Sequence, residues 1–241
     1  MLILIAIAAF ASTLLGGFFA LRFKDRLHLI LGFSAGAVIG VAFFDLLPEA
    51  IELGKEHHDI SLITSVVALG FIFYMVLDRL IVFHSHHHED DPADKATSRG
   101  KLGAGSLSVH SFLDGVAIGI GFQVSSAVGV IVAVAVLAHD FSDGINTVNL
   151  IIKNKGTRTE AFRWLLADAL APILGVVSTL VFTLPEGTLS LVLASFTGFF
   201  LYIGASDLLP ESHHAHPTLW TTAMTVFGVV VLYVVIQMAA I

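Results

Sequence analysis

Long apolar runs separated by short polar clusters extend over the whole chain. A run of about 20 apolar residues is long enough to cross the hydrocarbon core of a bilayer as one α-helix. Eight such runs fall at roughly 2–21, 28–50, 61–83, 102–123, 126–152, 159–183, 188–209 and 218–240. The pattern therefore predicts an all-α membrane protein in which residues 1–241 form a single polytopic domain of eight transmembrane helices.

The composition agrees with this interpretation. Only 13% of the 241 residues are charged, whereas a soluble globular protein carries roughly 25%, and the mean hydropathy is +0.89. Cysteine is absent, which excludes a disulfide framework, a thiolate metal site and a cysteine nucleophile. The net charge of −7 argues against nucleic acid as a partner, because binding to phosphates needs clustered Lys and Arg.

The distribution of Lys and Arg predicts an orientation. Eleven of the twelve lie in or beside the first, third and fifth loops, and Lys55 is the exception. Because cytoplasmic loops of membrane proteins are enriched in Lys and Arg, we expect the odd-numbered loops in the cytoplasm and both termini outside. We expect the protein in the lipid bilayer of the plasma (inner) membrane.

The longest connection, at about 85–100, is rich in histidine and is expected to be cytoplasmic. Its polar composition predicts a disordered accessory segment that binds metal loosely. The residues assigned to this role are His84, His86, His87, His88, Glu89, Asp90 and Asp91.

Two short motifs each occur twice. The pentapeptide 45–49, Asp-Leu-Leu-Pro-Glu, recurs at 207–211, near the ends of the second and seventh predicted spans. These spans run in opposite directions, as in the inverted repeats of secondary transporters. The alternatives are coincidence and an ordinary helix end that a proline follows.

The second motif, H-x-F-x-D-G, occupies 110–115 in the fourth span and 139–144 in the fifth. Residues four apart share a helix face, so His110 with Asp114, and His139 with Asp143, have the spacing of metal ligands. The turn near 123–125 is short, which predicts antiparallel neighbours whose polar faces can meet. Ser111, Asp140 and, at similar depth in the sixth span, Asp168 extend these polar faces.

Buried carboxylates in the bilayer need a cation. Each costs about 2.5–3.5 kcal/mol at the centre of a helix, and no Lys or Arg lies at this depth in the predicted spans. Protons or divalent metals could neutralise them, and the histidines favour zinc over magnesium or calcium. The alternative is that these residues only hydrogen-bond one helix to another.

Glycines recur at every fourth position, at 32, 36 and 40 in the second span and at 115 and 119 in the fourth. Such a stripe of small residues lets two helices approach closely. A smooth face on which one bundle slides past another is the functional alternative.

The eight spans, the histidine-rich third loop and the paired H-x-x-x-[DE]-G motifs resemble the ZIP (Zrt/Irt-like) family of divalent metal transporters. The resemblance covers essentially the whole chain and implies a 3+2+3 arrangement, a homodimer, an elevator-like motion and a mid-membrane site for one or two ions. The metal ligands it implies are His110, Ser111, Asp114, His139, Asp140, Asp143 and Asp168. Asp114 and Asp143 stand where many members of the family have Glu, which is one methylene longer.

Polar clusters near the ends of the second and seventh spans are candidate entrances and exits for metal. An acidic mouth raises the local concentration of cations. The residues are Asp45, Glu49, His57 and His58 on the outer side and Asp207, Glu211, His213, His214 and His216 on the inner side.

Transport of a divalent transition metal, most simply zinc, toward the cytoplasm is the leading interpretation. One alternative is an intramembrane zinc hydrolase, although H-E-x-x-H is absent. Others are an exporter of the cation-diffusion-facilitator type, which usually has six spans, and a proton-gated channel or purely structural membrane protein.

Overall fold

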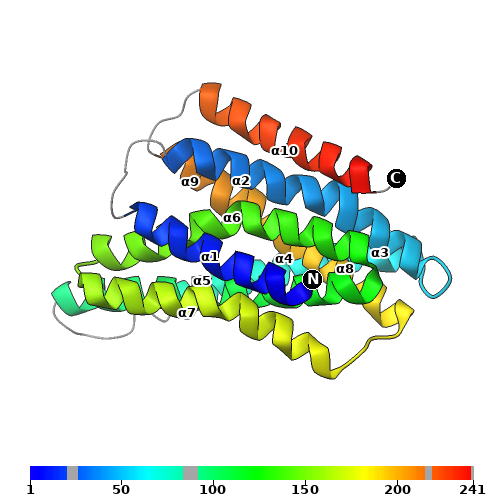
Figure 1. Cartoon of the computed structure of the whole chain (residues 1–241), viewed down its shortest axis with the longest axis horizontal. Helices are drawn as coiled ribbons and strands as arrows, with labels where there is room; N and C mark the ends of the chain where they lie inside the picture. The colour runs from blue at the N-terminus through cyan, green and yellow to red at the C-terminus, as the bar shows by residue number, and fades with distance from the viewer. Residues whose placement is uncertain (21–26, 84–91, 215–218, 240–241) are drawn as a thin grey trace. The chain divides into compact units, whose positions relative to one another are not determined.

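The computed structural model describes residues 1–20, 27–83, 92–214 and 219–239, and within these ranges the chain is helical almost throughout (Figure 1). Eight helical stretches of the described chain are long and apolar enough to cross a membrane. They are Leu2–Ala20, His28–Gly54, Ile60–Leu80, Gly100–Val124, Ser126–Lys153, Arg158–Val181, Glu186–Ser212 and Leu219–Met238. The eight predicted spans are confirmed, and the orientation in the membrane stays a prediction.

The chain forms two compact units. The helices α5 (Pro92–Val124) and α6 (Ser126–Lys153) contribute to both. One unit comprises Met1–Lys24, Val76–Val116 and Asp140–Ser178, and the other comprises Asp25–Met75, Ala117–His139 and Thr179–Ile241.

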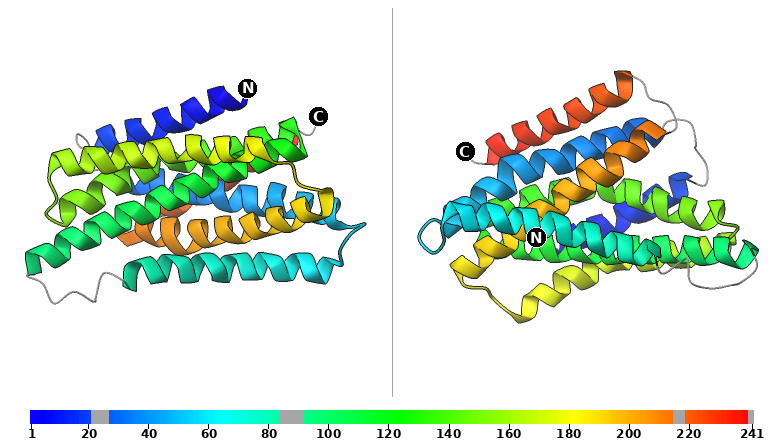
Figure 2. Two further views of the ribbon diagram at one scale, coloured as in Figure 1. Left: turned by 90° about the horizontal axis from the view of Figure 1, so that it is seen from below. Right: turned by 180° about the vertical axis from the view of Figure 1, so that it is seen from behind.

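In the first unit, glycines bring helix backbones into direct contact. The helix α1 (Leu2–Ala20) lies along α7 (Arg158–Ser178) (Figure 2). A Cβ atom at Gly115 of α5 would lie 2.1 Å from the carbonyl oxygen of Pro172 in α7, and one at Gly175 of α7 would lie 2.1 Å from that of Phe112. Helices α1 and α6 meet through a similar reciprocal pair, Gly16 and Gly144.

In the second unit, glycines also bring helix backbones into direct contact. The helix α2 (Leu27–Val41) packs along α10 (Leu219–Ala239). A Cβ atom at Gly36 would lie 1.9 Å from the carbonyl oxygen of Thr225, and one at Gly228 would lie 2.2 Å from that of Phe33. The predicted role of this glycine stripe in close packing is therefore confirmed. Gly70 and Gly198 join α4 (Ile60–Phe83) to α8 (Glu186–Tyr202) reciprocally.

These four glycine contacts follow the inverted repeat. Gly36 and Gly198 each lie nine residues before the Asp of the repeated pentapeptide, and Gly115 and Gly144 each end an H-x-F-x-D-G motif. The inverted repeat relates the first three spans to the last three and the fourth span to the fifth. Under this relation the contact between α1 and α6 corresponds to the contact between α7 and α5. The contact between α2 and α10 corresponds in the same way to the contact between α8 and α4. The packing thus agrees with the 3+2+3 arrangement.

The repeated pentapeptide also has one backbone conformation in both copies. The π-helical segments η1 (Ala42–Leu46) and η4 (Ile203–Leu208) continue directly into α3 (Leu47–Gly54) and α9 (Leu209–His214). Pro48 and Pro210 therefore do not end these spans, as an ordinary helix terminus would require. Each lies in the first turn of the following α-helix, where the missing N–H of proline costs least.

The connection expected at 85–100 is shorter than predicted. The helix α5 already begins at Pro92, so 92–100 is helical rather than a loop. Proline is favoured at the first position of a helix, and the alanines and lysine that follow are good helix formers. The histidine-rich run 84–91 lies outside the described residues.

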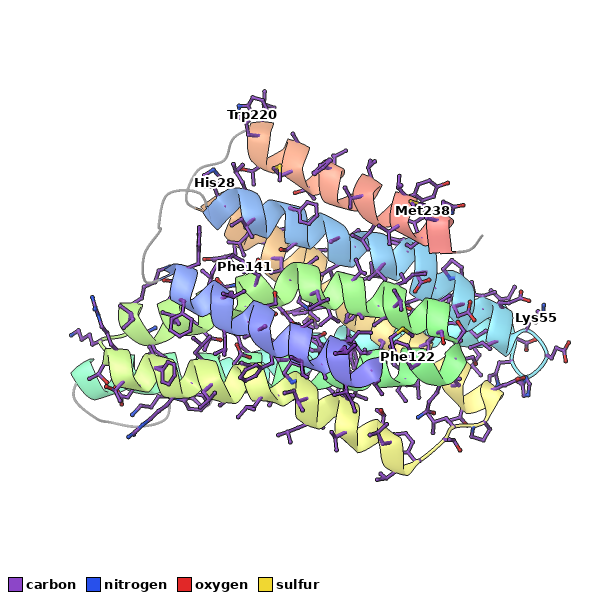
Figure 3. The ribbon with its side chains drawn as sticks, viewed as in Figure 1. His28, Lys55, Phe122, Phe141, Trp220 and Met238 are labelled. Carbon is purple, nitrogen blue, oxygen red and sulfur yellow. The ribbon has the colours of Figure 1, made fainter. Side chains whose placement is uncertain are left out.

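Large apolar side chains are exposed on the outward faces of several helices. At the two ends of α10, Trp220 and Met238 point away from the neighbouring helix, with 74% and 71% of their surface exposed (Figure 3). Such faces are compatible with lipid, where apolar side chains need no protein cover.

Candidate metal centre

The paired H-x-F-x-D-G motifs place four ligand-type side chains in the buried parts of α5 and α6. His110 and Asp114 lie one turn apart on α5, and His139 and Asp143 lie one turn apart on α6. All four are buried, with exposed fractions of 4% or less. The helical period therefore gives each helix one imidazole and one carboxylate on the same face.

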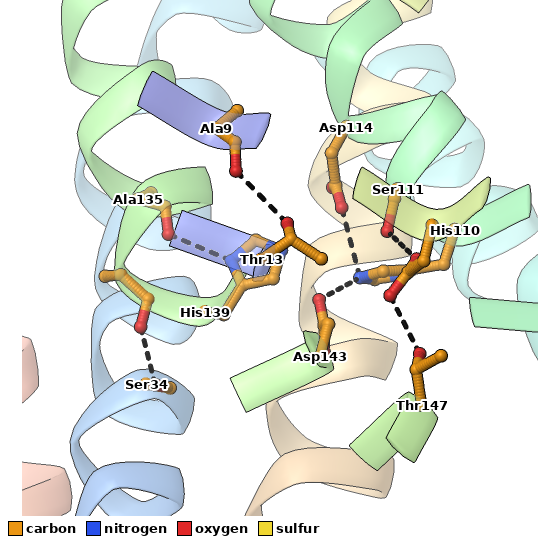
Figure 4. A network of polar contacts seen from close by, with 12 residues as sticks. Ala9, Thr13, Ser34, His110, Ser111, Asp114, Ala135, His139, Asp143 and Thr147 are labelled. Carbon is orange, nitrogen blue, oxygen red and sulfur yellow. Dashed lines mark hydrogen bonds and ion pairs between the residues drawn. The ribbon is translucent and has the colours of Figure 1, made fainter. Parts of the chain in front are cut away.

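One imidazole nitrogen faces two carboxylates (Figure 4). His110 Nε2 lies 3.1 Å from Asp114 Oδ2 on its own helix and 3.4 Å from Asp143 Oδ2 on α6. Two ligand atoms of a tetrahedral zinc ion, each about 2.0–2.1 Å from the metal, are about 3.3 Å apart. These two distances match the spacing of ligand atoms around one ion, and the two motifs meet as predicted.

The surroundings of His139 favour the tautomer that a metal ligand needs. Its Nδ1 lies 2.9 Å from the carbonyl oxygen of Ala135, one turn earlier in α6. A carbonyl oxygen only accepts, so Nδ1 is the donor, and in the neutral ring Nε2 then carries the lone pair that a metal needs. Along the uninterrupted helix α6, His139 directly precedes Asp140. One ligand atom from each of His110, Asp114, His139 and Asp143 lies within 4.8 Å of the others.

The electrostatics of the first unit favour a cation. Its buried carboxylates are Asp114, Asp140, Asp143 and Asp168, each 2% exposed or less. Among the residues whose burial the structure describes, no Lys or Arg is buried. A group of carboxylates without a fixed positive charge is stable in a low-dielectric interior only with protons or metal ions.

The other three predicted ligands lie beside the four that converge. Asp140 is fully buried on α6, but it is outside the group whose ligand atoms meet within 4.8 Å. The Ser111 hydroxyl donates a hydrogen bond of 2.7 Å to Asp168 Oδ1, which joins α5 to α7. These two residues therefore contact each other.

Thr147 is a site residue that sequence reasoning missed. Its hydroxyl donates a hydrogen bond of 2.8 Å to Asp168 Oδ2, and its side chain is fully buried. The sequence carries a signal for it, because Thr147 follows Asp143 by four positions and so lies on the same face of α6.

The candidate outer mouth lies in the second unit. Asp45 is in η1 with 8% of its surface exposed, and its Oδ2 is buried without a hydrogen-bond partner. Glu49 follows one turn later in α3. In the turn after α3, His57 is exposed, and His58 Nε2 donates to the carbonyl oxygen of Gly187 at 3.1 Å.

The candidate inner mouth is described in part. Glu211 is exposed on α9. The backbones of Asp207, His213 and His214 are helical, their side chains lie outside the description, and His216 lies outside the described residues. Among the side chains that the structure describes, none of these mouth residues belongs to the group of converging ligands.

Comparison with known proteins decides the family. The family model described as ZIP zinc transporter matches residues 1–106 and 104–236. The chain belongs to the ZIP family. Relatives include zinc transporter ZIP9-A of Xenopus laevis, which is 27% identical over 230 residues, spanning 78% of this chain and 76% of that protein. Zinc transporter ZupT of Corynebacterium aurimucosum is 26% identical over 219 residues, spanning 83% of each.

A third ZIP relative, zinc transporter YKE4 of Saccharomyces cerevisiae, is 24% identical over 230 residues, which span 81% of this chain and 65% of that protein. The membership confirms the resemblance noted from the paired motifs. The protein is thus a multi-pass helical member of the ZIP family with a buried His/Asp cluster that could form a metal site.

Proposed function

We propose that this ZIP protein carries divalent transition-metal ions, zinc foremost, across the membrane toward the cytoplasm. His110, Asp114, His139 and Asp143 bind the ion during its passage. The observation that carries the proposal is that His110 Nε2 lies 3.1 and 3.4 Å from two buried carboxylate oxygens. The relatives' printed names support zinc as the first ion to test.

Charge balance favours this ligand set for a divalent ion. Two carboxylates and two neutral imidazoles carry a total charge of −2, so one Zn²⁺ makes the group neutral. A neutral group avoids most of the cost of holding charge in the bilayer. Nitrogen and oxygen ligands at this spacing suit zinc better than magnesium, which demands octahedral oxygen ligands.

A zinc hydrolase is not favoured. A catalytic zinc site has three protein ligands, an open position for water and a base outside the ligand set. The four converging ligands leave no such open position in a tetrahedral site, and the relatives are named as transporters.

The path and assembly extend the proposal. Asp45 and Glu49 attract the cation at the outer end of the second span, because buried and half-buried carboxylates create a negative potential. The excess of Lys and Arg in the odd loops supports cytoplasmic placement of these loops and both termini outside. As the family resemblance implies, the functional form is a homodimer.

Zinc uptake into proteoliposomes tests the proposal. Purified protein is reconstituted, radioactive zinc is added outside, and cold manganese, iron, cobalt and cadmium compete. Uptake above protein-free liposomes that is lost in the double variant His110→Ala/Asp143→Ala supports transport and ranks the ions. Binding of zinc without uptake by the wild-type protein would contradict transport.

Deletion of the histidine-rich run 84–91 is expected to leave zinc uptake active. The run lies outside the spans, so its histidines and carboxylates bind metal only loosely. We expect altered release or regulation, measured as a changed uptake rate at rising zinc concentration. A protein in which Gly and Ser residues replace the run at equal length is the control. Complete loss of uptake in both proteins would contradict an accessory role.

A further inference from the structure

Four exposed basic side chains lie around the turn that joins α6 to α7 in the first unit. These residues, the basic cluster, are Lys153, Lys155, Arg158 and Arg163. Among the residues that the structure describes, none of the four forms an ion pair. Glu160, which lies between the two arginines, pairs instead with Lys101 at 3.1 Å and accepts a hydrogen bond from the N–H of Thr157. The basic cluster therefore carries positive charge that no described carboxylate balances.

Lys155 occupies a backbone position that normally favours glycine. Its φ of 62° is left-handed, a conformation that is unfavourable for a residue with a Cβ atom. The N–H of Gly156 donates to the carbonyl oxygen of Ile151 at 2.9 Å, and that of Lys155 donates to Ile152 at 3.3 Å. These two bonds form a Schellman motif, which usually has glycine where Lys155 stands. A lysine kept there at a conformational cost indicates a use for its charge.

An exposed apolar surface continues from the basic cluster along α7. Leu170 and Leu174 follow Arg163 by seven and eleven positions, which places all three on one side of the helix. The two leucines are 41% and 60% exposed. At the same end of α7, Phe162 packs against Phe18 of α1 with ring centroids 6.2 Å apart, and both residues are about half exposed. Positive charge and apolar side chains thus adjoin on one surface.

A phospholipid with a negatively charged headgroup fits this combination. Arg and Lys near the end of a span reach toward the headgroup layer, where tryptophan, here Trp164 beside Arg163, is also enriched. A guanidinium group pairs with phosphate through two parallel hydrogen bonds. Basic residues next to a span attract anionic headgroups, and the cytoplasmic leaflet, which the fifth loop is predicted to face, is negatively charged.

We propose that the basic cluster binds the phosphate of an anionic phospholipid whose acyl chains lie along Leu170 and Leu174. A zwitterionic lipid has the same phosphate, but its own ammonium group cancels the charge. The site therefore selects lipids by the net charge of the headgroup. This role is separate from the ligand group on α5 and α6 and does not depend on which ion is transported.

Lipid affinity in detergent tests the proposal. Purified protein is titrated with phosphatidylglycerol or with phosphatidylcholine of the same acyl chains, and native mass spectrometry counts the bound lipid. We expect phosphatidylglycerol to bind more tightly than phosphatidylcholine. Arg163→Gln and Lys155→Gly should each lower its affinity about 5-fold. Lys55→Gln, which removes one charge from an exposed position in the second unit, should leave the affinity unchanged.

Lys155→Gly separates the charge from the stability of the fold. Glycine adopts a left-handed φ without a steric cost. In lipid-free detergent, this variant should therefore unfold at a temperature at least as high as that of the wild-type protein, while it binds phosphatidylglycerol more weakly. Thermal unfolding followed by tryptophan fluorescence measures this.

Other results would overturn the inference. Equal affinity for the two lipids would show that the headgroup charge is not read. Wild-type affinity in Arg163→Gln or Lys155→Gly would place the lipid elsewhere, and an equal loss in Lys55→Gln would reduce the effect to net charge. Displacement of the lipid by inorganic phosphate at equal concentration would make free phosphate the ligand. Zinc is absent from these assays, so failure of the proposed transport would leave their results unchanged.

Discussion

Zinc uptake by Asp143→Asn is expected to fall to the level of protein-free liposomes while the protein stays folded. Asp143 Oδ2 lies 3.4 Å from His110 Nε2, and the side chain is 2% exposed. Asparagine has nearly the same shape but no charge, so the four ligands could no longer neutralise a divalent ion. We expect zinc affinity to fall by more than about 100-fold, the upper end of the loss caused by removing an outer partner.

The measurement compares uptake and zinc binding of Asp143→Asn with those of Glu186→Gln. Glu186 is exposed at the start of α8, whereas the ligand group is buried. Its conversion to an amide therefore removes one charge from the surface, at a position distant from the ligand group in sequence. We expect the control to retain uptake. Near-normal uptake by Asp143→Asn would contradict a site shared by α5 and α6.

Gly115→Ala is expected to destabilise the protein and abolish uptake, whereas Gly105→Ala should do neither. Both glycines lie on α5 and face α7, but a Cβ atom at Gly115 would lie 2.1 Å from the backbone oxygen of Pro172. A Cβ atom at Gly105 would make an ordinary contact of 3.6 Å with the ring of Trp164. Overpacking of this kind costs about 1–3 kcal/mol or more, and it moves α7 away from the ligands.

Thermal stability in detergent and zinc uptake per folded protein check this pair. In a helix interior, alanine is otherwise favoured over glycine by about 1 kcal/mol, so Gly105→Ala should be neutral or stabilising. A displacement of about 1 Å at a site can cost 10²-fold in rate. Equal stability and uptake in the two variants would show that α5 and α7 do not need backbone contact at Gly115.

The spans and the ligand group follow directly from sequence, because each depends on local periodicity. Apolar length predicts a span, and the i, i+4 spacing of His110 with Asp114 predicts a shared face. The second helix of the site was also predictable, since the motif recurs and the intervening turn is short. These features need no knowledge of which distant residues meet.

Other features depend on tertiary contacts that local pattern does not encode. The stripe at Gly36 predicts a close helix neighbour, but its partner Gly228 is known only from the packing. The hydrogen bond between Thr147 and Asp168 joins residues on different helices. The π-helical backbone before Pro48 leaves hydropathy unchanged, so the sequence left an ordinary helix end open as an alternative there.

The π segment η1 changes which side of the second span faces its neighbours. A π-helical turn holds one more residue than an α-helical turn, and one residue corresponds to about 100° of rotation around a helix. Before this segment, α2 packs along α10, and after it, α3 packs against α8. The second span therefore packs against α10 with one side and against α8 with another, and no loop interrupts it. The same extra residue in η4 gives the seventh span an equivalent shift in register.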